Sequence, residues 1–351
     1  MNIAILTIQS VNYGNRLQNY ALQTVLDGLG NRTCSLRRDA GFHGSSESKL
    51  RAVRHKLGVL RHWSDRYGSF RRFDRDFISF SDSVVSKEYV SPHLNSNHDC
   101  FVIGSDQVWN PDFDFNSDLE YLPMVSRGKK VAYAASFGVA GIAENRERTA
   151  GLLEDIGAIS VREAAGADIV RGLTGRDAPV VLDPTLLLGP SDWAAVAKKP
   201  SGFHSGRPYV FKYILGDDVN DGRIAALADS RGLEVLDVMD GSLAAGPSEF
   251  VWLIAHSGLV CTDSFHASVF ALLHHRPLAI FERVSSDADM SSRFDTFCAN
   301  FGLAGHRSSE SSFCEDAVFS TDWDDVDLRL DRLRASSLTW LRGALGGVAR
   351  G

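Results

Sequence analysis

The stretch Cys261-Thr-Asp-Ser-Phe-His266-Ala-Ser-Val-Phe-Ala271 decides the fold class, because an apolar strand runs directly into a helix. Asp263 or Ser264 can cap that helix, and the apolar residues that follow supply its buried face. His266 falls in the first turn, where free backbone N–H groups and the helix dipole favour a phosphate or a carboxylate. A capping turn with a structural histidine explains the same residues.

The rest of the chain repeats this alternation of short apolar runs with helical patterns, which is typical of parallel sheets covered by helices. We therefore predict an α/β protein with two doubly wound, Rossmann-like domains facing a cleft. The predicted strands are Asn2–Ile8, Cys100–Ile103, Val131–Ala135, Ala158–Val161 and Val180–Leu182 in the first domain, and Tyr209–Ile214, Leu233–Val238, Leu259–Thr262 and Leu278–Glu282 in the second.

The predicted boundaries place an N-terminal domain at 1–190, with a helical insertion around 45–80. A C-terminal domain follows at 200–325, and a closing helix at 326–351. In doubly wound sheets ligands bind beyond the carboxyl ends of the strands, so the residues directly after strands are the candidates for a site.

Composition excludes several classes of protein. The chain has 351 residues, and its hydrophobic fraction of 44% is that of a well-packed globular protein. Its net charge of −7 disfavours nucleic acid as the main partner. No stretch approaches the roughly 20 apolar residues of a membrane span. The 5 cysteines are scattered without metal-ligand spacing, so we expect reduced thiols, no metal site and a cytoplasmic protein. The basic block 49–75 leaves open a peripheral position at the inner membrane.

Two polar clusters follow first-domain strands and suit a hydroxyl-rich ligand. In the turn after the first strand, Asn12, Tyr13 and Asn15 offer hydrogen-bonding groups. After a later strand, Asp106 can accept hydrogen bonds from sugar hydroxyls while Trp109 stacks on the ring. A plain strand-to-helix turn, and an Asx-turn at Asp106 with Trp109 buried in the core, are the alternatives.

Candidate anion ligands are arginines. Arg162 directly follows a strand, and its guanidinium can grip a carboxylate or a phosphate through paired N–H donors. A salt bridge to the adjacent Glu163 is the alternative. Arg283 and Arg293 flank a polar loop after the last second-domain strand and could bring positive charge to the helix at Ser264.

Six motifs together resemble the polysaccharide pyruvyl transferase family, in the family's order and over nearly the whole chain. The family is similar in fold to two-domain GT-B glycosyltransferases and transfers the enolpyruvyl group of phosphoenolpyruvate onto a sugar, forming a pyruvate ketal. The motifs are Asn12-Tyr-Gly-Asn-Arg-Leu-Gln-Asn-Tyr-Ala-Leu-Gln23, Gly104-Ser-Asp-Gln-Val-Trp-Asn-Pro111, Ala134-Ala-Ser-Phe-Gly138, Ser160-Val-Arg-Glu163, Leu182-Asp-Pro-Thr185 and Thr262-Asp-Ser-Phe-His266.

The resemblance implies roles for individual residues. Arg162 and His266 match positions that bind phosphoenolpyruvate, and Arg293 takes the place of a lysine that serves the same anion in some members. Several members carry Arg-Leu-His where this chain has Ser264-Phe265-His266, so Ser264 and Arg293 are the substitutes for the missing cation. Phosphoenolpyruvate is then a co-substrate on the side of the C-terminal domain, with the acceptor on the side of the N-terminal domain, and no cofactor or metal is needed.

The chemistry assigns His266 as proton donor or phosphate partner, and Asp106 as base or acceptor ligand. The acceptor is a sugar or glycan, lipid-linked, nucleotide-linked or free. The competing enzyme class is a GT-B glycosyltransferase with a nucleotide-sugar donor, for which Glu282 would resemble a ribose-binding residue. A non-catalytic sugar- or anion-binding module is the third hypothesis.

Overall fold

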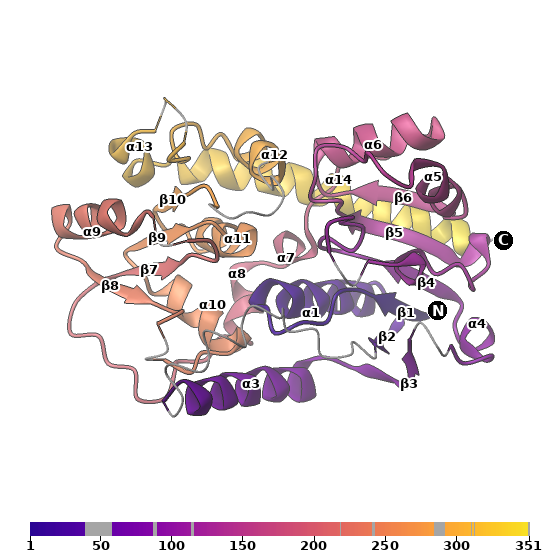
Figure 1. Cartoon of the computed structure of the whole chain (residues 1–351), viewed down its shortest axis with the longest axis horizontal. Helices are drawn as coiled ribbons and strands as arrows, with labels where there is room; N and C mark the ends of the chain where they lie inside the picture. The colour runs from indigo at the N-terminus through magenta and orange to yellow at the C-terminus, as the bar shows by residue number, and fades with distance from the viewer. Residues whose placement is uncertain are drawn as a thin grey trace.

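The computed structural model describes residues 1–38, 58–86, 90–113, 116–217, 219–240, 243–283, 292–309, 311 and 313–349. Within them the chain forms two parallel sheets, each covered by helices, with α1 (Tyr13–Gly28), α7 (Pro184–Leu187) and α11 (Phe265–Leu273) between the sheets (Figure 1). The predicted α/β class with two doubly wound, Rossmann-like sheets is confirmed. The domain boundaries at 190 and 200 stay predictions.

The first sheet has 6 strands in the order β3-β2-β1-β4-β5-β6, which is the Rossmann order, and all are parallel. Its central strands are continuous apolar runs because helices cover both faces of the sheet. The strands are β1 Asn2–Leu6, β2 Arg32–Arg38, β3 Phe80–Val85, β4 Cys100–Ile103, β5 Lys130–Ala135 and β6 Ala158–Val161.

The second sheet has 4 parallel strands in the order β10-β9-β7-β8. Strands β7 and β9 lie inside it and are buried throughout, whereas β8 is an edge strand with exposed residues. The strands are β7 Tyr209–Tyr213, β8 Glu234–Asp237, β9 Leu259–Thr262 and β10 Leu278–Ile280.

Helices connect and cover the strands. The helices are α1 Tyr13–Gly28, α3 Gly58–Phe77, α4 Leu94–Asn97, α5 Arg146–Glu154, α6 Ala164–Thr174, α7 Pro184–Leu187, α8 Pro190–Ala194, α9 Asp221–Ser230, α10 Pro247–Ala255, α11 Phe265–Leu273, α12 Ser292–Phe301, α13 Glu315–Phe319 and α14 Trp323–Val348, with the short 3-10 turns η1 Asp118–Tyr121 and η2 Arg127–Lys129.

The strand predictions fail in three places. Residues Val180–Leu182 form no strand and contribute a single bridge between Val180 and Val161. Strands β2 and β3 were not predicted, because polar residues interrupt both of them. The helical insertion predicted around 45–80 appears as α3, and the part of that prediction before residue 58 lies outside the described residues.

One continuous apolar core joins the two domains, and Tyr13 at the start of α1 lies inside it. Its ring stacks on Phe250 of α10 at 4.3 Å between centroids and meets Tyr213 of β7 edge-on at 5.4 Å. The hydroxyl donates a hydrogen bond to the Ala245 carbonyl at 3.0 Å, and the residue is only 1% exposed. The prediction that Tyr13 binds an acceptor is therefore corrected: Tyr13 is a packing residue between the domains.

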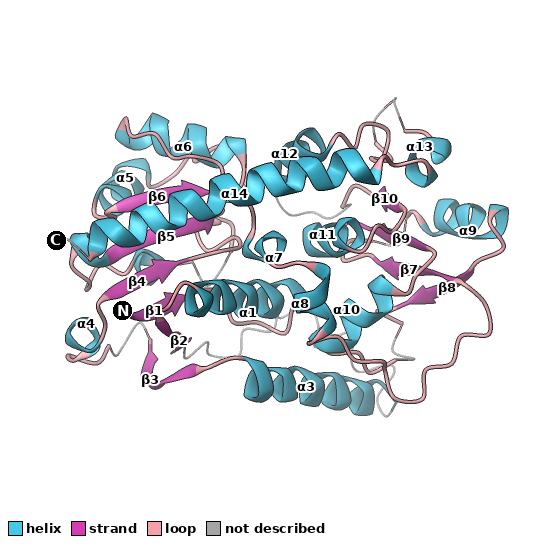
Figure 2. Cartoon of the chain, turned by 180° about the vertical axis from the view of Figure 1, so that it is seen from behind, coloured by secondary structure: helices cyan, strands magenta, loops and turns pink. Residues whose placement is uncertain are grey.

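The closing helix α14 crosses from the second domain back over the first, as Figure 2 shows. It contacts α12 in the second domain and β5 and α7 in the first. Ser337 accepts a hydrogen bond from the Leu182 N–H at 3.0 Å, which fixes the segment leading into α7. Among the helices of the described ranges, none combines the length and the apolarity required to cross a membrane.

Candidate active site

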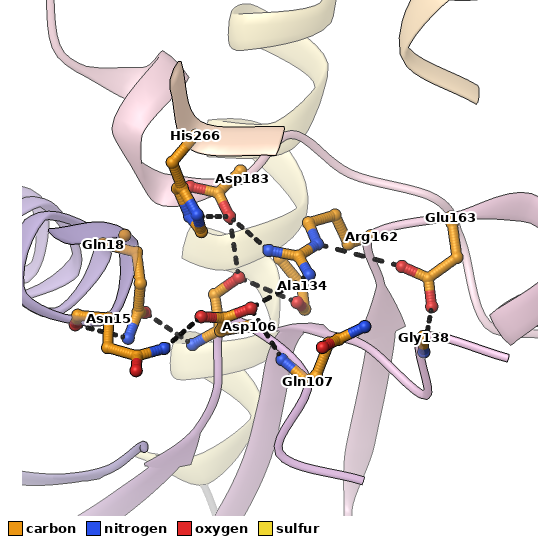
Figure 3. Close-up of polar contacts among 12 residues, drawn as sticks. Asn15, Gln18, Asp106, Gln107, Ala134, Gly138, Arg162, Glu163, Asp183 and His266 are labelled. Carbon is orange, nitrogen blue, oxygen red and sulfur yellow. Dashed lines mark hydrogen bonds and ion pairs between the residues drawn. The ribbon is translucent and has the colours of Figure 1, made fainter. Parts of the chain in front are cut away.

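Three strands from both sheets end at one place, between the domains (Figure 3). Asp106 lies just beyond β4, Arg162 directly follows β6, and His266 lies in the first turn of α11, which follows β9. All three are nearly buried, with exposed fractions of 6%, 4% and 5%. The three candidate residues come from separate segments of the sequence, and they meet here because each follows the carboxyl end of a strand.

Asp183, which the sequence did not single out as a site residue, lies at the centre of this group. Its Oδ1 accepts hydrogen bonds from the backbone and the hydroxyl of Thr185, at 3.0 and 2.6 Å. Its Oδ2 accepts from Ser105 at 3.2 Å and from Arg162 at 2.9 Å, and lies 3.4 Å from Nε2 of His266. Burial opposes ionisation, but His266, Arg162 and Thr185 outweigh it and hold the pKa of Asp183 well below its usual range.

Arg162 is surrounded by carboxylates of its own domain. Besides Asp183, its guanidinium contacts Asp106 at 3.2 Å, and Nε lies 3.8 Å from Glu163. Burial works against the positive charge, but the three carboxylates together raise the pKa of Arg162. The alternative of a salt bridge to Glu163 is thus part of the arrangement, and the anion-gripping role stays a prediction.

Asp106 has a left-handed backbone with φ 65°, a conformation that aspartate tolerates better than most residues. Its Oδ2 accepts a hydrogen bond from Nδ2 of Asn15 in α1, and its Oδ1 accepts from the Gln107 N–H at 2.9 Å. Burial alone would raise the pKa of Asp106, yet its interactions with Arg162, His266 and Arg293 lower that pKa overall. Asp106 is therefore held as an anion.

His266 fits into a narrow space between the domains. A Cβ atom placed on Gly14 would lie 2.0 Å from Nδ1 of His266, so only glycine at that position allows α1 to approach the ring. On the opposite side, Nε2 lies 3.4 Å from Oδ2 of Asp183. Gly14 of the first motif therefore leaves the space that the ring of His266 in the last motif occupies.

Arg293 in α12 contrasts with Arg162. Its Cζ lies 5.9 Å from the centroid of the Phe265 ring, and that of Arg162 lies 4.7 Å from the same centroid. Arg293 is 7% exposed, and in the described residues no carboxylate lies within 4.0 Å of it. Burial and the nearby charge of Arg162 lower the pKa of Arg293 to about 10. An unpaired buried cation is costly, so this position is suited to an anionic ligand.

Ser264 is the N-cap of α11, as the sequence predicted for this position or its neighbour, and its hydroxyl accepts from the Ala267 N–H at 3.5 Å. Asp263 instead accepts from Leu215 and Gly216 at 2.8 Å each and pairs with Arg283 at 3.2 Å. Arg283 is thereby held by Asp263, beside α11. The role of Ser264 as a phosphate ligand stays a prediction.

Trp109 is not available as a platform for a sugar. It is 1% exposed, its ring stacks on Tyr121 at 5.3 Å, and its N–H donates to the Glu120 carbonyl at 3.3 Å. The alternative, a tryptophan buried in the core, is correct. Asn12 caps α1 by accepting from the Gly14 N–H at 2.8 Å, and it is half-buried.

Two further residues of the site escaped the sequence analysis. Asp183 follows the apolar run 180–182 and precedes Pro184, so the rule that favours residues after strands could have found it. Glu163 is fully buried and accepts hydrogen bonds from Phe137 and Gly138 at 3.1 and 3.4 Å. The only feature of the sequence that pointed to Glu163 was its position beside Arg162.

Glu282, the candidate ribose ligand, pairs with Arg307 at 2.6 Å.

A family model described as polysaccharide pyruvyl transferase matches residues 12–285, which is more than half of the chain. The chain belongs to this family. The matched segment contains Asp106, Arg162, Asp183 and His266, while Arg293 lies beyond it. No curated protein sequence matches the chain.

Solved structures resemble the chain only loosely. A protein described as a UDP-N-acetylglucosamine 2-epimerase from Listeria monocytogenes is 9% identical, with 95% of this chain and 90% of that one covered, at a TM-score of 0.43. The glycosyltransferase SnogD from Streptomyces nogalater is 14% identical, with 99% of both chains covered, at 0.41. The E. coli ADP-heptose LPS heptosyltransferase II is 12% identical, with coverages of 96% and 99%, at 0.40. These likenesses carry no functional weight.

Within the described ranges, no three His, Cys, Asp or Glu side chains gather as a metal-binding group. The site offers guanidinium groups, an imidazole and a helix N-terminus, together with carboxylates on the first-domain side. Such a set can bind an anion beside groups that accept and donate protons.

Proposed function

We propose that this family member transfers the enolpyruvyl group of phosphoenolpyruvate onto a sugar acceptor, forming a pyruvate ketal and releasing phosphate. The observation that carries the proposal is the convergence of Arg162 and Arg293 on the Phe265 ring beside His266. Phosphoenolpyruvate has a carboxylate and a phosphate, and two guanidinium groups beside the N-terminus of α11 suit such a doubly anionic molecule.

Arg293 is the stronger candidate for direct contact with the donor. A ligand anion would supply the partner that it lacks among the described residues, whereas Arg162 already holds Asp106 and Asp183. On this proposal the donor lies on the second-domain side. Asn12, Asn15 and Asp106 then belong to the acceptor side.

The reaction needs one proton donor and one base. A proton from His266 adds to the methylene carbon C3 of phosphoenolpyruvate, and an acceptor hydroxyl oxygen bonds to C2 while its proton passes to the base. Phosphate then leaves C2 with the bonding electron pair. A second hydroxyl attacks C2 and loses its proton, which closes the ketal. Asp106, held as an anion, is the candidate base or acceptor ligand.

The cavity lined by Arg162, Asp183, Phe265 and Arg293 has a volume of about 20 Å³. This is enough for about one water molecule and too small for phosphoenolpyruvate. On this proposal, donor binding requires the side chains that line this cavity to move apart.

Calorimetric titration tests the donor without knowledge of the acceptor. Phosphoenolpyruvate and a panel of nucleotide sugars are titrated into the wild type, Arg162→Ala and Arg293→Ala. Arg171→Ala is the matched control, because Arg171 is an exposed arginine of α6 whose partners are Asp168 and Asp177. We expect phosphoenolpyruvate to bind the wild type and the control, and to lose at least roughly tenfold in affinity in both site variants.

Other outcomes would point elsewhere. Binding of a nucleotide sugar without phosphoenolpyruvate would overturn the proposal in favour of glycosyl transfer. Binding of phosphoenolpyruvate that persists in both site variants would place the donor at another site. Binding without turnover of any sugar acceptor would indicate a non-catalytic module.

A further inference from the structure

Asp183 has a place in the site that the proposed chemistry leaves unused. Thr185 fixes Oδ1 from its backbone and its hydroxyl, so the carboxylate cannot rotate freely. Oδ2 is then directed at Ser105, Arg162 and His266. Only His266 of these three belongs to the second domain, so this contact crosses the domain junction (Figure 3).

The His266 ring is confined from both sides. Gly14 lies against Nδ1, and Asp183 lies 3.4 Å from Nε2. A carboxylate only accepts hydrogen bonds, so in a neutral imidazole the nitrogen that faces it is the one that carries the proton. The other nitrogen, Nδ1, is then directed at Gly14 in the first turn of α1.

We infer that Asp183 is a positioning residue that keeps the proton of His266 on Nε2 and turns Nδ1 toward the first turn of α1. The inference rests on the proposed function in one respect, because it assigns the orientation of the proposed proton donor. The ring meets Asp183 only while α11 lies against α1 and α7. The orientation of His266 therefore depends on the two domains being in contact.

The tautomer of His266 tests this inference directly. Protein labelled with ¹⁵N-histidine is studied by long-range ¹H–¹⁵N correlation at a pH where the ring is neutral, and His266→Gln identifies the signals. We expect the wild type to show the Nε2–H form and Asp183→Asn to show a mixture of both forms. Asp74→Asn is the control, because it breaks an ion pair between α1 and α3 that does not involve His266.

A second variant keeps the inference testable if Asp183→Asn misfolds. Gly14→Ala places a methyl group against Nδ1, so the ring must leave its present position between Gly14 and Asp183, while Thr185, Ser105 and Arg162 keep their contacts with the carboxylate. Gly28→Ala, at the exposed end of the same helix with no atom within 4 Å of the new Cβ, is the matched control. We expect the mixture of tautomers in Gly14→Ala and the wild-type form in Gly28→Ala.

A wild-type tautomer in both Asp183→Asn and Gly14→Ala would overturn the inference, and so would a wild-type protein with its proton on Nδ1. Titration with phosphoenolpyruvate separates this result from the proposed function. If the affinity for phosphoenolpyruvate falls on the order of tenfold in both Asp183→Asn and Gly14→Ala, as expected for residues that contact the same histidine, the result supports both the inference and the proposed function. If the wild type binds no phosphoenolpyruvate but the tautomers change as expected, the proposed function fails and the positioning role stands.

Discussion

The two halves of the site differ in charge. The first-domain half, consisting of Asp106, Arg162, Glu163 and Asp183, holds one guanidinium among three carboxylates. The second-domain half, consisting of His266, Arg293 and the N-terminus of α11, has a guanidinium without a carboxylate partner in the described part of the chain. The first half therefore has excess negative charge, and the second half has excess positive charge. Their difference explains how they can attract each other and where an anionic donor would bind.

The largest effect is expected when the first half loses its only guanidinium. Arg162→Ala leaves three buried carboxylates without their central partner, and removal of one member of a buried pair costs about 3–5 kcal/mol of unfolding free energy. Urea unfolding followed by circular dichroism measures this loss. The exposed Arg171→Ala should stay within about 0.5 kcal/mol of the wild type. A small loss in Arg162→Ala would mean that the carboxylates are not held by this arginine.

The two halves should also respond differently to acid. The folded-state pKa values of Asp106 and Asp183 are lowered, so their ionised forms stabilise the protein above their unfolded-state pKa of about 3.9. This stability is lost as the pH falls through the folded-state values. Below about pH 4 the unfolding free energy of Asp106→Asn should therefore fall less steeply with decreasing pH than that of the wild type. The two slopes should differ by at most about 1.4 kcal/mol per pH unit. Asparagine tolerates the left-handed backbone at this position.

Thermal and urea unfolding between pH 2.5 and 7 would measure the difference. Parallel curves for the wild type and Asp106→Asn would show that Asp106 contributes nothing to acid sensitivity. Arg293 cannot contribute in this range, because its pKa of about 10 lies far above it.

The smallest effect on stability is expected in the second half. Arg293→Ala removes a buried cation that has no carboxylate partner among the described residues, so we expect a change of less than about 1 kcal/mol, in either direction. Arg307→Ala is the matched comparison, because Arg307 is equally buried at 7% exposed and pairs with Glu282 and Asp295. The Arg307 variant should lose more stability in urea unfolding. Equal losses would contradict the proposed contrast between the halves.

The sequence by itself determined the fold class and most of the strands. The runs Cys100–Ile103, Ala158–Val161 and Leu259–Thr262 match β4, β6 and β9 in full, because strands buried on both faces must be continuously apolar. Strands β2 and β3 were missed because polar residues interrupt both of them. The apolar run at 180–182 was mistaken for a strand.

The sequence also placed Asp106, Arg162 and His266 after strands, where ligands bind in such sheets. It could not decide which neighbouring aromatic residues are exposed. Trp109 and Tyr13 sit in the same motifs as genuine site residues, but both are buried in the apolar core. Exposure depends on what packs against a residue, and those partners come from distant segments such as α10 and η1.

Only the tertiary structure showed that Asp183 joins the site and that Gly14 makes room for His266. Both facts depend on contacts between residues more than 80 positions apart in the chain. Local sequence patterns contain the hydrophobic periodicity and the capping residues of single helices and strands, so they predicted which elements form. The distances between side chains on different elements are set by how the two domains pack, and this packing decided the charge balance of the site.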